Sequence, residues 1–135
     1  MQINAEKFIE DLDKSSLENS IYLISGNEPG LISKTEKLIL SNIKSKEIPD
    51  MRTVDYKINK NIDLNEVVNS RSLFEEKIFL SIKNPPETIL DRVKNVHLSG
   101  ITIVINGENL KSSSKIKSFF KAHKKFYSVV CYKLS

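Results

Sequence analysis

The sequence predicts an α/β protein with three layers, in which a parallel β-sheet is covered by helices on both faces. Short apolar runs alternate with amphipathic stretches along all 135 residues, which is typical of repeated strand and helix units. The strongest apolar runs, residues 21–25 and 101–105, are continuous, as in strands that are buried on both faces. Five predicted strands separated by helices imply parallel pairing through right-handed crossovers.

The first third of the chain predicts a helix, a strand and a second helix. Residues 5–12 are amphipathic and follow Asn4, whose side chain can cap the first turn. Residues 21–25 form the first central strand. The next helix covers residues 29–44, because Pro29 has the backbone angle of a first helical turn and lacks the N–H group that this turn leaves unpaired.

The middle of the chain predicts two further units. Residues 52–57 alternate and contain β-branched and aromatic side chains, which favours a strand near the edge of the sheet. Asp63 can cap the short helix that follows. Residues 77–82 form another buried strand, and the pair Pro85 and Pro86 introduces the helix after it.

The last unit begins with the strand of residues 101–105 and ends with a strand over residues 126–131. The cap of the helix between them is one of three serines, Ser112, Ser113 or Ser114. The apolar stripe of this helix consists of Ile116, Phe119 and Phe120. We therefore expect these side chains to face the sheet.

Composition excludes several classes of protein. Hydrophobic residues make up 39% and charged residues 28%, as in an ordinary globular domain. No apolar run reaches the roughly 20 residues of a membrane span, and the first residues resemble no signal peptide. One Cys and two His cannot form a tetrahedral zinc site. We expect a single domain over residues 1–135, monomeric, cytoplasmic, and without metal, cofactor or membrane partner.

A glycine-containing turn follows the first central strand. It consists of Gly26, Asn27, Glu28, Pro29 and Gly30. Strand, turn and helix together have the shape of a phosphate-binding loop, but the motif GxxxxGK[ST] fits in neither possible register. Glu28 places negative charge where a phosphate would lie, and Pro29 removes one N–H donor. We expect a degenerate, non-functional phosphate loop.

The ends of the later strands offer no catalytic group. Lys83 and Asn84 follow one strand without an acid that could hold Mg²⁺ through water. Asn106 and Glu108 follow the next strand, where a turn and a solvated charge are the simpler interpretation. The two histidines, His97 and His123, are expected to be solvated at helix ends.

Lysines are concentrated near the last helix. They are Lys111, Lys115, Lys117, Lys121, Lys124 and Lys125. With a net charge of +4 and a pI of about 9.1, they allow a nucleic-acid-binding surface as one hypothesis. The alternative is a helix with solvated lysines, which the inward position of Phe119 and Phe120 favours because those rings are then poor candidates for base stacking.

One connection carries two large apolar residues in polar surroundings. Leu73 and Phe74 follow Ser72 and precede Glu75 and Glu76, between a predicted helix and the strand of residues 77–82. They either fold back as a cap on the core or protrude as a plug that fills a pocket on a partner. In a partner pocket, each buried side chain would contribute roughly 1.5 to 3 kcal/mol.

The chain resembles the N-terminal domain of the delta subunit of the bacterial DNA polymerase III clamp loader. The resemblance rests on residues 21–29, on Ser72-Leu73-Phe74 before a buried strand, and on the strand 101–105 with its lysine- and serine-rich helix. It implies an AAA-type, RecA-like nucleotide-binding fold without a working phosphate loop. Neither ATP binding nor enzymatic activity is implied for the chain itself, which would belong to the polymerase holoenzyme.

The resemblance also implies a function for the apolar pair. Leu73 and Phe74 would insert into the hydrophobic cleft of the ring-shaped β sliding clamp, with Ser72 fitting beside them, and would favour the open ring during DNA replication. Contacts with the other loader subunits would use later domains of the family, and contact with DNA would be indirect. The alternatives are a nucleic-acid-binding module and an active phosphate-loop nucleotidase.

Overall fold

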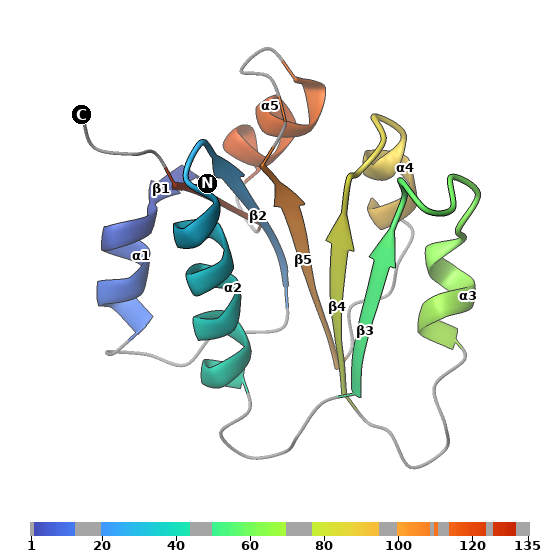
Figure 1. Cartoon of the computed structure of the whole chain (residues 1–135), viewed down its shortest axis with the longest axis horizontal. Helices are drawn as coiled ribbons and strands as arrows, with labels where there is room; N and C mark the ends of the chain where they lie inside the picture. Colours follow the sequence, from blue (N-terminus) through green and yellow to red (C-terminus); the bar gives the residue numbers. More distant parts are fainter. Residues whose placement is uncertain are drawn as a thin grey trace.

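The computed structural model describes residues 2–12, 20–43, 50–69, 77–94, 100–108, 110, 114–123 and 126–131. Strands and helices alternate along these ranges (Figure 1). In chain order they are β1 (Gln2–Asn4), α1 (Ala5–Leu12), β2 (Ile21–Gly26), α2 (Pro29–Ile43), β3 (Asp50–Asp55), α3 (Leu64–Asn69), β4 (Ile78–Lys83), α4 (Ile89–Lys94), β5 (Ile101–Gly107), α5 (Lys115–Ala122) and β6 (Tyr127–Cys131). The predicted α/β class is confirmed.

The strands form a six-stranded sheet in the order β1-β6-β2-β5-β4-β3, and all five neighbouring pairs are parallel. β2, β4 and β5 are buried over nearly their whole length, as their continuous apolar sequences predict. β3 lies at one edge, as predicted, although it begins two residues earlier than expected, at Asp50. The sixth strand, β1, was not predicted, because its three residues have no apolar periodicity and pair only with β6.

Helices cover both faces of the sheet (Figure 1). On one face, α1 and α2 pack on a cluster that includes Phe8, Tyr22 and Ile39. On the other face, α3, α4 and α5 pack on a larger cluster of aliphatic side chains with Phe120. Burying each such side chain contributes roughly 1.5 to 3 kcal/mol, so the two clusters hold the three layers together. None of the helices that the structure describes is long and apolar enough for a bilayer crossing.

Two predicted helix caps are present. The Asn4 side-chain oxygen accepts a hydrogen bond from the Lys7 N–H group at 2.8 Å. Of the three candidate serines, Ser114 caps α5, and its hydroxyl oxygen accepts from the Ile116 N–H group at 3.1 Å. A side-chain oxygen at this position satisfies one of the amide groups that a first helical turn leaves unpaired. Both short helices therefore begin directly after the polar residue that caps them.

Candidate functional site

The glycine turn between β2 and α2 has the position of a phosphate-binding loop but is attached to β6. Gly26 has a φ of 137°, and a β-carbon there would lie 2.0 Å from the Cys131 carbonyl oxygen. Only glycine fits both the backbone conformation and this close approach. The approach brings the turn within hydrogen-bonding distance of the last residue of β6.

The amide groups of this turn are occupied by the protein itself. The N–H groups of Asn27 and Glu28 both donate to the Cys131 carbonyl oxygen, at 3.1 and 3.2 Å. Pro29, the next residue, has no N–H group. A phosphate-binding nest needs several free N–H groups that converge on one anion. Residues 27–29 therefore offer none that is free to do so.

The side chains around the turn do not replace those donors. Glu28 is partly buried next to the first turn of α2, where its carboxylate suits the helix dipole and would repel a phosphate. Lys34 is exposed on α2. The buried Thr35 hydroxyl donates to the Leu31 carbonyl oxygen at 2.7 Å, one helical turn back. The residue types of a phosphate loop occur here without its geometry.

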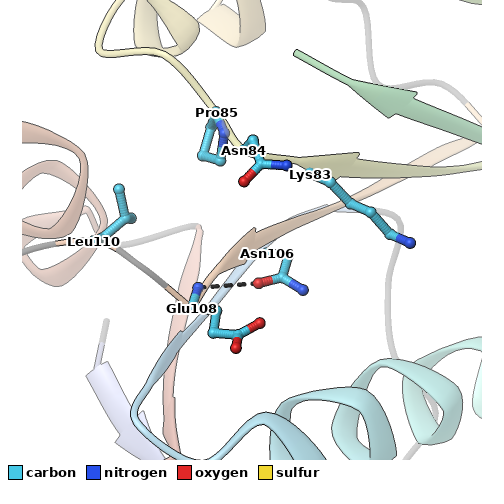
Figure 2. A pocket seen from close by; sticks show the side chains of 6 residues that line it. All are labelled: Lys83, Asn84, Pro85, Asn106, Glu108 and Leu110. Atoms are coloured by element: carbon cyan, nitrogen blue, oxygen red, sulfur yellow. Dashed lines mark hydrogen bonds between the residues drawn. The ribbon is translucent and has the colours of Figure 1, made fainter. Parts of the chain in front are cut away.

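A polar pocket of about 410 Å³ lies at the carboxyl ends of β4 and β5 (Figure 2). Its lining residues are Lys83, Asn84, Pro85, Asn106, Glu108 and Leu110. The Asn106 side-chain oxygen accepts from the Glu108 N–H group at 3.0 Å, and Glu108 is exposed, which matches the predicted turn and solvated charge. Among the described residues no group of three or more potential metal ligands occurs.

The sequence did not reveal that Asn84 is tied to the end of β3. Asn84 has a φ of 52°, and its side-chain amide donates to the Asp55 carboxylate at 2.9 Å. This hydrogen bond, together with one from the Lys57 N–H group, holds the pKa of Asp55 below its ordinary value. Asp55 therefore stays ionised and connects the two strand ends. The signal that could have found this pair was an Asn directly after a strand, since Asn tolerates positive φ.

Helix α5 carries the exposed Lys115 and Lys121, and its aromatic rings point inward. Phe120 is completely buried, and Phe119 packs on the same cluster, as predicted. His123 caps the end of α5, but it is partly buried rather than solvated, because its ring stacks on Phe126 at 4.1 Å and its Nδ1 accepts from the Phe126 N–H group. His97 lies outside the described residues. The rings near α5 are thus packed on one another and on the core, which argues against base stacking.

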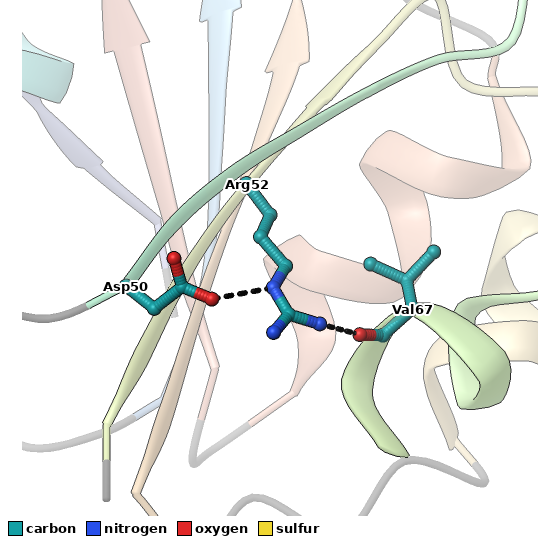
Figure 3. A network of polar contacts seen from close by, with 3 residues as sticks. All are labelled: Asp50, Arg52 and Val67. Carbon is teal, nitrogen blue, oxygen red and sulfur yellow. Dashed lines mark hydrogen bonds and ion pairs between the residues drawn. The ribbon is translucent and has the colours of Figure 1, made fainter. Parts of the chain in front are cut away.

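The predicted plug, Ser72, Leu73 and Phe74, lies outside the described residues, whereas the helix before it, α3, is among them. Arg52 on β3 lies between Asp50 and the end of α3 (Figure 3). Its Nε donates to the Asp50 carboxylate at 2.6 Å, and its Nη1 donates to the Val67 carbonyl oxygen. A cation is favourable at the carboxyl end of a helix. Arg52 therefore holds the end of α3 from which the chain continues towards the plug.

A second arginine holds the loop before α3. The guanidinium of Arg92 on α4 donates to the Ile62 carbonyl oxygen at 2.5 Å, and the Tyr56 hydroxyl donates to the same oxygen at 3.2 Å. Arg92 also lies 5.2 Å from the centre of the Tyr56 ring, within the range of a cation–π contact. The six-residue helix α3 is thus held near both ends by side chains.

Comparison with known proteins gives a family match and a similar solved structure. A sequence model of the family described as "DNA polymerase III, delta subunit" matches residues 22–133. The fold is similar to that of the DNA clamp loader delta protein YqeN of Bacillus subtilis, with a TM-score of 0.67 and 15% sequence identity over 97% of this chain. The match spans 43% of that longer protein. No curated protein matches the sequence.

Proposed function

We propose, because this chain belongs to the DNA polymerase III delta subunit family, that it binds the β sliding clamp and favours the open ring through Ser72, Leu73 and Phe74. The family match carries this proposal, since the matched residues 22–133 contain the segment. Delta subunits are components of the clamp loader and are not themselves catalytic polymerases. Leu73 and Phe74 would be the anchors, in the way that a few large apolar residues dominate most protein interfaces.

The surroundings of α3 support this role. The segment leaves α3 after Asn69 and reaches β4 at Ile78. Arg52 fixes the carboxyl end of α3 to the edge strand β3, so the helix can present the start of the segment in one orientation. A preorganised segment loses less conformational entropy when it binds. The arginine contact would therefore contribute to clamp affinity without touching the clamp.

The proposal includes the absence of ATP binding and hydrolysis at the glycine turn. The two amide groups bonded to Cys131 and the missing N–H of Pro29 support it, as does the engaged hydroxyl of Thr35. Calorimetry with ATP in the presence and absence of Mg²⁺ tests this part. Saturable binding that requires Mg²⁺, or hydrolysis above background, would show that the turn rearranges into a working loop.

Residues 1–135 would serve as the clamp-binding domain, acting as a monomer in the cytoplasm when isolated. Assembly with other clamp-loader subunits, and through them contact with DNA, would use the parts of the longer relatives that this chain does not match. Clamp binding alone should therefore be retained by the chain as it stands.

The decisive experiment changes Leu73 and Phe74 together to Ala. We expect clamp binding to weaken by at least about 2 kcal/mol, roughly thirtyfold, while the unfolding free energy changes little. The matched control changes Met51 and Ile58 to Ala, because these are large apolar side chains that are 56% and 83% exposed elsewhere on the surface. The control should leave clamp binding intact.

The other interpretation of the pair, a cap on the core, gives the opposite result. The same double change would then lower the unfolding free energy by roughly 2 to 5 kcal/mol, as buried large-to-Ala changes do. If the variant melts much earlier while its folded fraction binds clamp normally, the proposal is wrong. Thermal unfolding and clamp binding measured on one preparation separate the two.

A further inference from the structure

A second polar pocket, of about 260 Å³, lies between α5 and the β1 edge of the sheet. We call it the serine–lysine pocket. Its polar lining consists of Gln2, Ser25, Lys117, Ser118, Lys121 and Ser128. None of the described residues that line it is acidic. Its lining includes no residue of the glycine turn and none of the proposed plug.

The floor of the pocket is unusual for the face of a sheet. Ser25 on β2 and Ser128 on β6 are 0% and 2% exposed, and both lie on neighbouring strands of the core. The Ser25 hydroxyl has no hydrogen-bond partner among the described residues. A buried hydroxyl without a partner costs roughly 1 to 3 kcal/mol, so such groups are rare in folded proteins and usually meet an ordered water, an ion or a ligand.

The wall of the pocket carries two like charges. Lys117 and Lys121 are one helical turn apart on α5, on the face next to that of the buried Ile116 and Phe120. Like charges at this spacing destabilise a helix by roughly 0.2 to 0.5 kcal/mol. An anion bound between them would interact favourably with both ammonium groups. The positive charge of the two lysines and the buried Ser25 hydroxyl thus both favour an anion.

We propose that the serine–lysine pocket binds a phosphate group. The ammonium groups of Lys117 and Lys121 would balance its charge, and the Ser25 hydroxyl would donate to one of its oxygens. The volume of about 260 Å³ exceeds that of a single phosphate, so the group can be a free ion or the end of a small nucleotide. Binding would not need Mg²⁺, because the lysines supply the positive charge.

The test uses inorganic phosphate at constant ionic strength, with binding followed by the backbone amide resonances of labelled protein. We expect saturable binding that perturbs the amide resonances of Ser25 and Lys121. The variants Ser25→Ala and Lys121→Gln should each weaken it at least tenfold. Lys37→Gln, on the exposed side of α2 across the sheet, is the matched control and should bind as the wild type does.

Stability measurements distinguish a ligand-binding role of the Ser25 hydroxyl from a structural one. Without phosphate, Ser25→Ala should be at least as stable as the wild type, because the change removes an unpaired buried hydroxyl. A large loss of stability in Ser25→Ala would overturn the proposal, as would unchanged phosphate binding in that variant. Absence of saturable binding to the wild type would also overturn it.

A dinucleotide shows whether the bound phosphate is a free ion or the terminal group of a nucleotide. A 5′-phosphorylated dinucleotide that competes with inorganic phosphate, with the same loss in both variants, identifies a terminal phosphate group as a ligand. Failure to compete restricts the site to the free ion. Equal binding of the unphosphorylated dinucleotide would contradict phosphate recognition.

Discussion

The glycine turn and helix α3 are held to the rest of the molecule in different ways. The turn is attached by main-chain hydrogen bonds from Asn27 and Glu28 to the Cys131 carbonyl oxygen. Helix α3 is attached by side chains, through Arg52 at its end and Arg92 before its start. Main-chain attachment consumes the N–H groups that a phosphate would need. Side-chain attachment holds α3 through carbonyl oxygens at Val67 and Ile62.

This difference determines which main-chain groups each connection leaves available. The turn keeps its shape because β6 approaches it closely at Gly26, and the same approach removes its donors. The short helix α3 gains its order from β3 and α4, since a six-residue helix is not stable alone.

The largest expected effect comes from Gly26→Ala. Its β-carbon would lie 2.0 Å from the Cys131 carbonyl oxygen at a φ of 137°, so the turn must separate from β6. We expect the unfolding free energy, measured in urea, to fall by more than about 4 kcal/mol. In Gly30→Ala, the matched control, the new β-carbon would meet only the Glu28 carboxylate at 3.4 Å. That variant should change stability by less than about 1 kcal/mol.

A control as unstable as Gly26→Ala would mean that any added side chain in this turn is harmful. The attachment to Cys131 would then not be what distinguishes Gly26. Mg²⁺-dependent ATP binding that appears in a folded Gly26→Ala variant and not in the wild type would show that attachment to β6 keeps the loop closed.

The second effect concerns Arg52→Met, which keeps the length of the side chain but removes its charge. Losing hydrogen bonds from a charged donor costs roughly 1.5 to 3 kcal/mol. We expect the unfolding free energy to fall by an amount in the lower half of this range, because the Arg52 side chain is 18% exposed and water can replace part of the interaction. Clamp affinity should also fall, since α3 loses its anchor. The exposed Lys57→Met on the adjoining turn is the control. An Arg52 variant with full clamp affinity would show that α3 does not orient the plug.

Most of the secondary structure could be predicted from the sequence because it depends on local patterns. Continuous apolar runs gave β2, β4 and β5, and polar caps gave the start of α1 and of α5. Each of these signals lies within a few residues of the element it specifies. The resemblance to delta subunits added the family, which the match over residues 22–133 confirms.

The contacts that distinguish the two regions could not be predicted, because they join distant parts of the chain. Nothing near Gly26 indicates that Cys131 accepts its neighbours' hydrogen bonds. Nothing near Val67 indicates that Arg52 donates to its carbonyl oxygen. The first contact appears only when the order of strands in the sheet is known, and the second only when the packing of α3 on β3 is known. Strand order depends on packing across the whole domain rather than on any short motif.

A smaller effect is expected at Asn84, where the conformation is left-handed but the residue already carries a β-carbon. Asn84→Ala loses the hydrogen bond to Asp55 and keeps an unfavourable φ of 52°, so we expect a loss of about 1 kcal/mol. Asn84→Gly loses only the hydrogen bond and should lie within about 0.5 kcal/mol of the wild type. Equal losses in both variants would assign the effect to the hydrogen bond alone.

The same variants should change the titration of Asp55. Its pKa is held below the ordinary value chiefly by the Asn84 hydrogen bond, and both substitutions should raise it towards that value. A lowered pKa stabilises the fold above the ordinary value of 3.8, and this contribution is lost as the pH falls through the folded pKa. NMR titration of the carboxyl carbon measures the change directly. An unchanged Asp55 pKa in both variants would contradict this assignment.

The smallest effect is a pH dependence of stability that appears only in alkali. It concerns Cys131, whose carbonyl oxygen accepts the hydrogen bonds of the glycine turn. Burial raises the pKa of the Cys131 thiol above its ordinary value of 9.0, against the opposing contact with the Thr35 hydroxyl at 3.8 Å. The folded state therefore keeps a proton that the unfolded state loses, so the unfolding free energy should fall as the pH rises above 9. Cys131→Ala should lose this dependence between pH 9 and 10. Tyr56 does not interfere in this range, because its ordinary pKa is 10.0 and burial raises it further.

Urea unfolding at several pH values measures the dependence of the unfolding free energy on pH. A thiol reagent should label Cys131 only as fast as the protein opens. Rapid labelling of folded protein would show that β6 separates from the turn more readily than its two hydrogen bonds imply, and the contrast with α3 would then be one of degree.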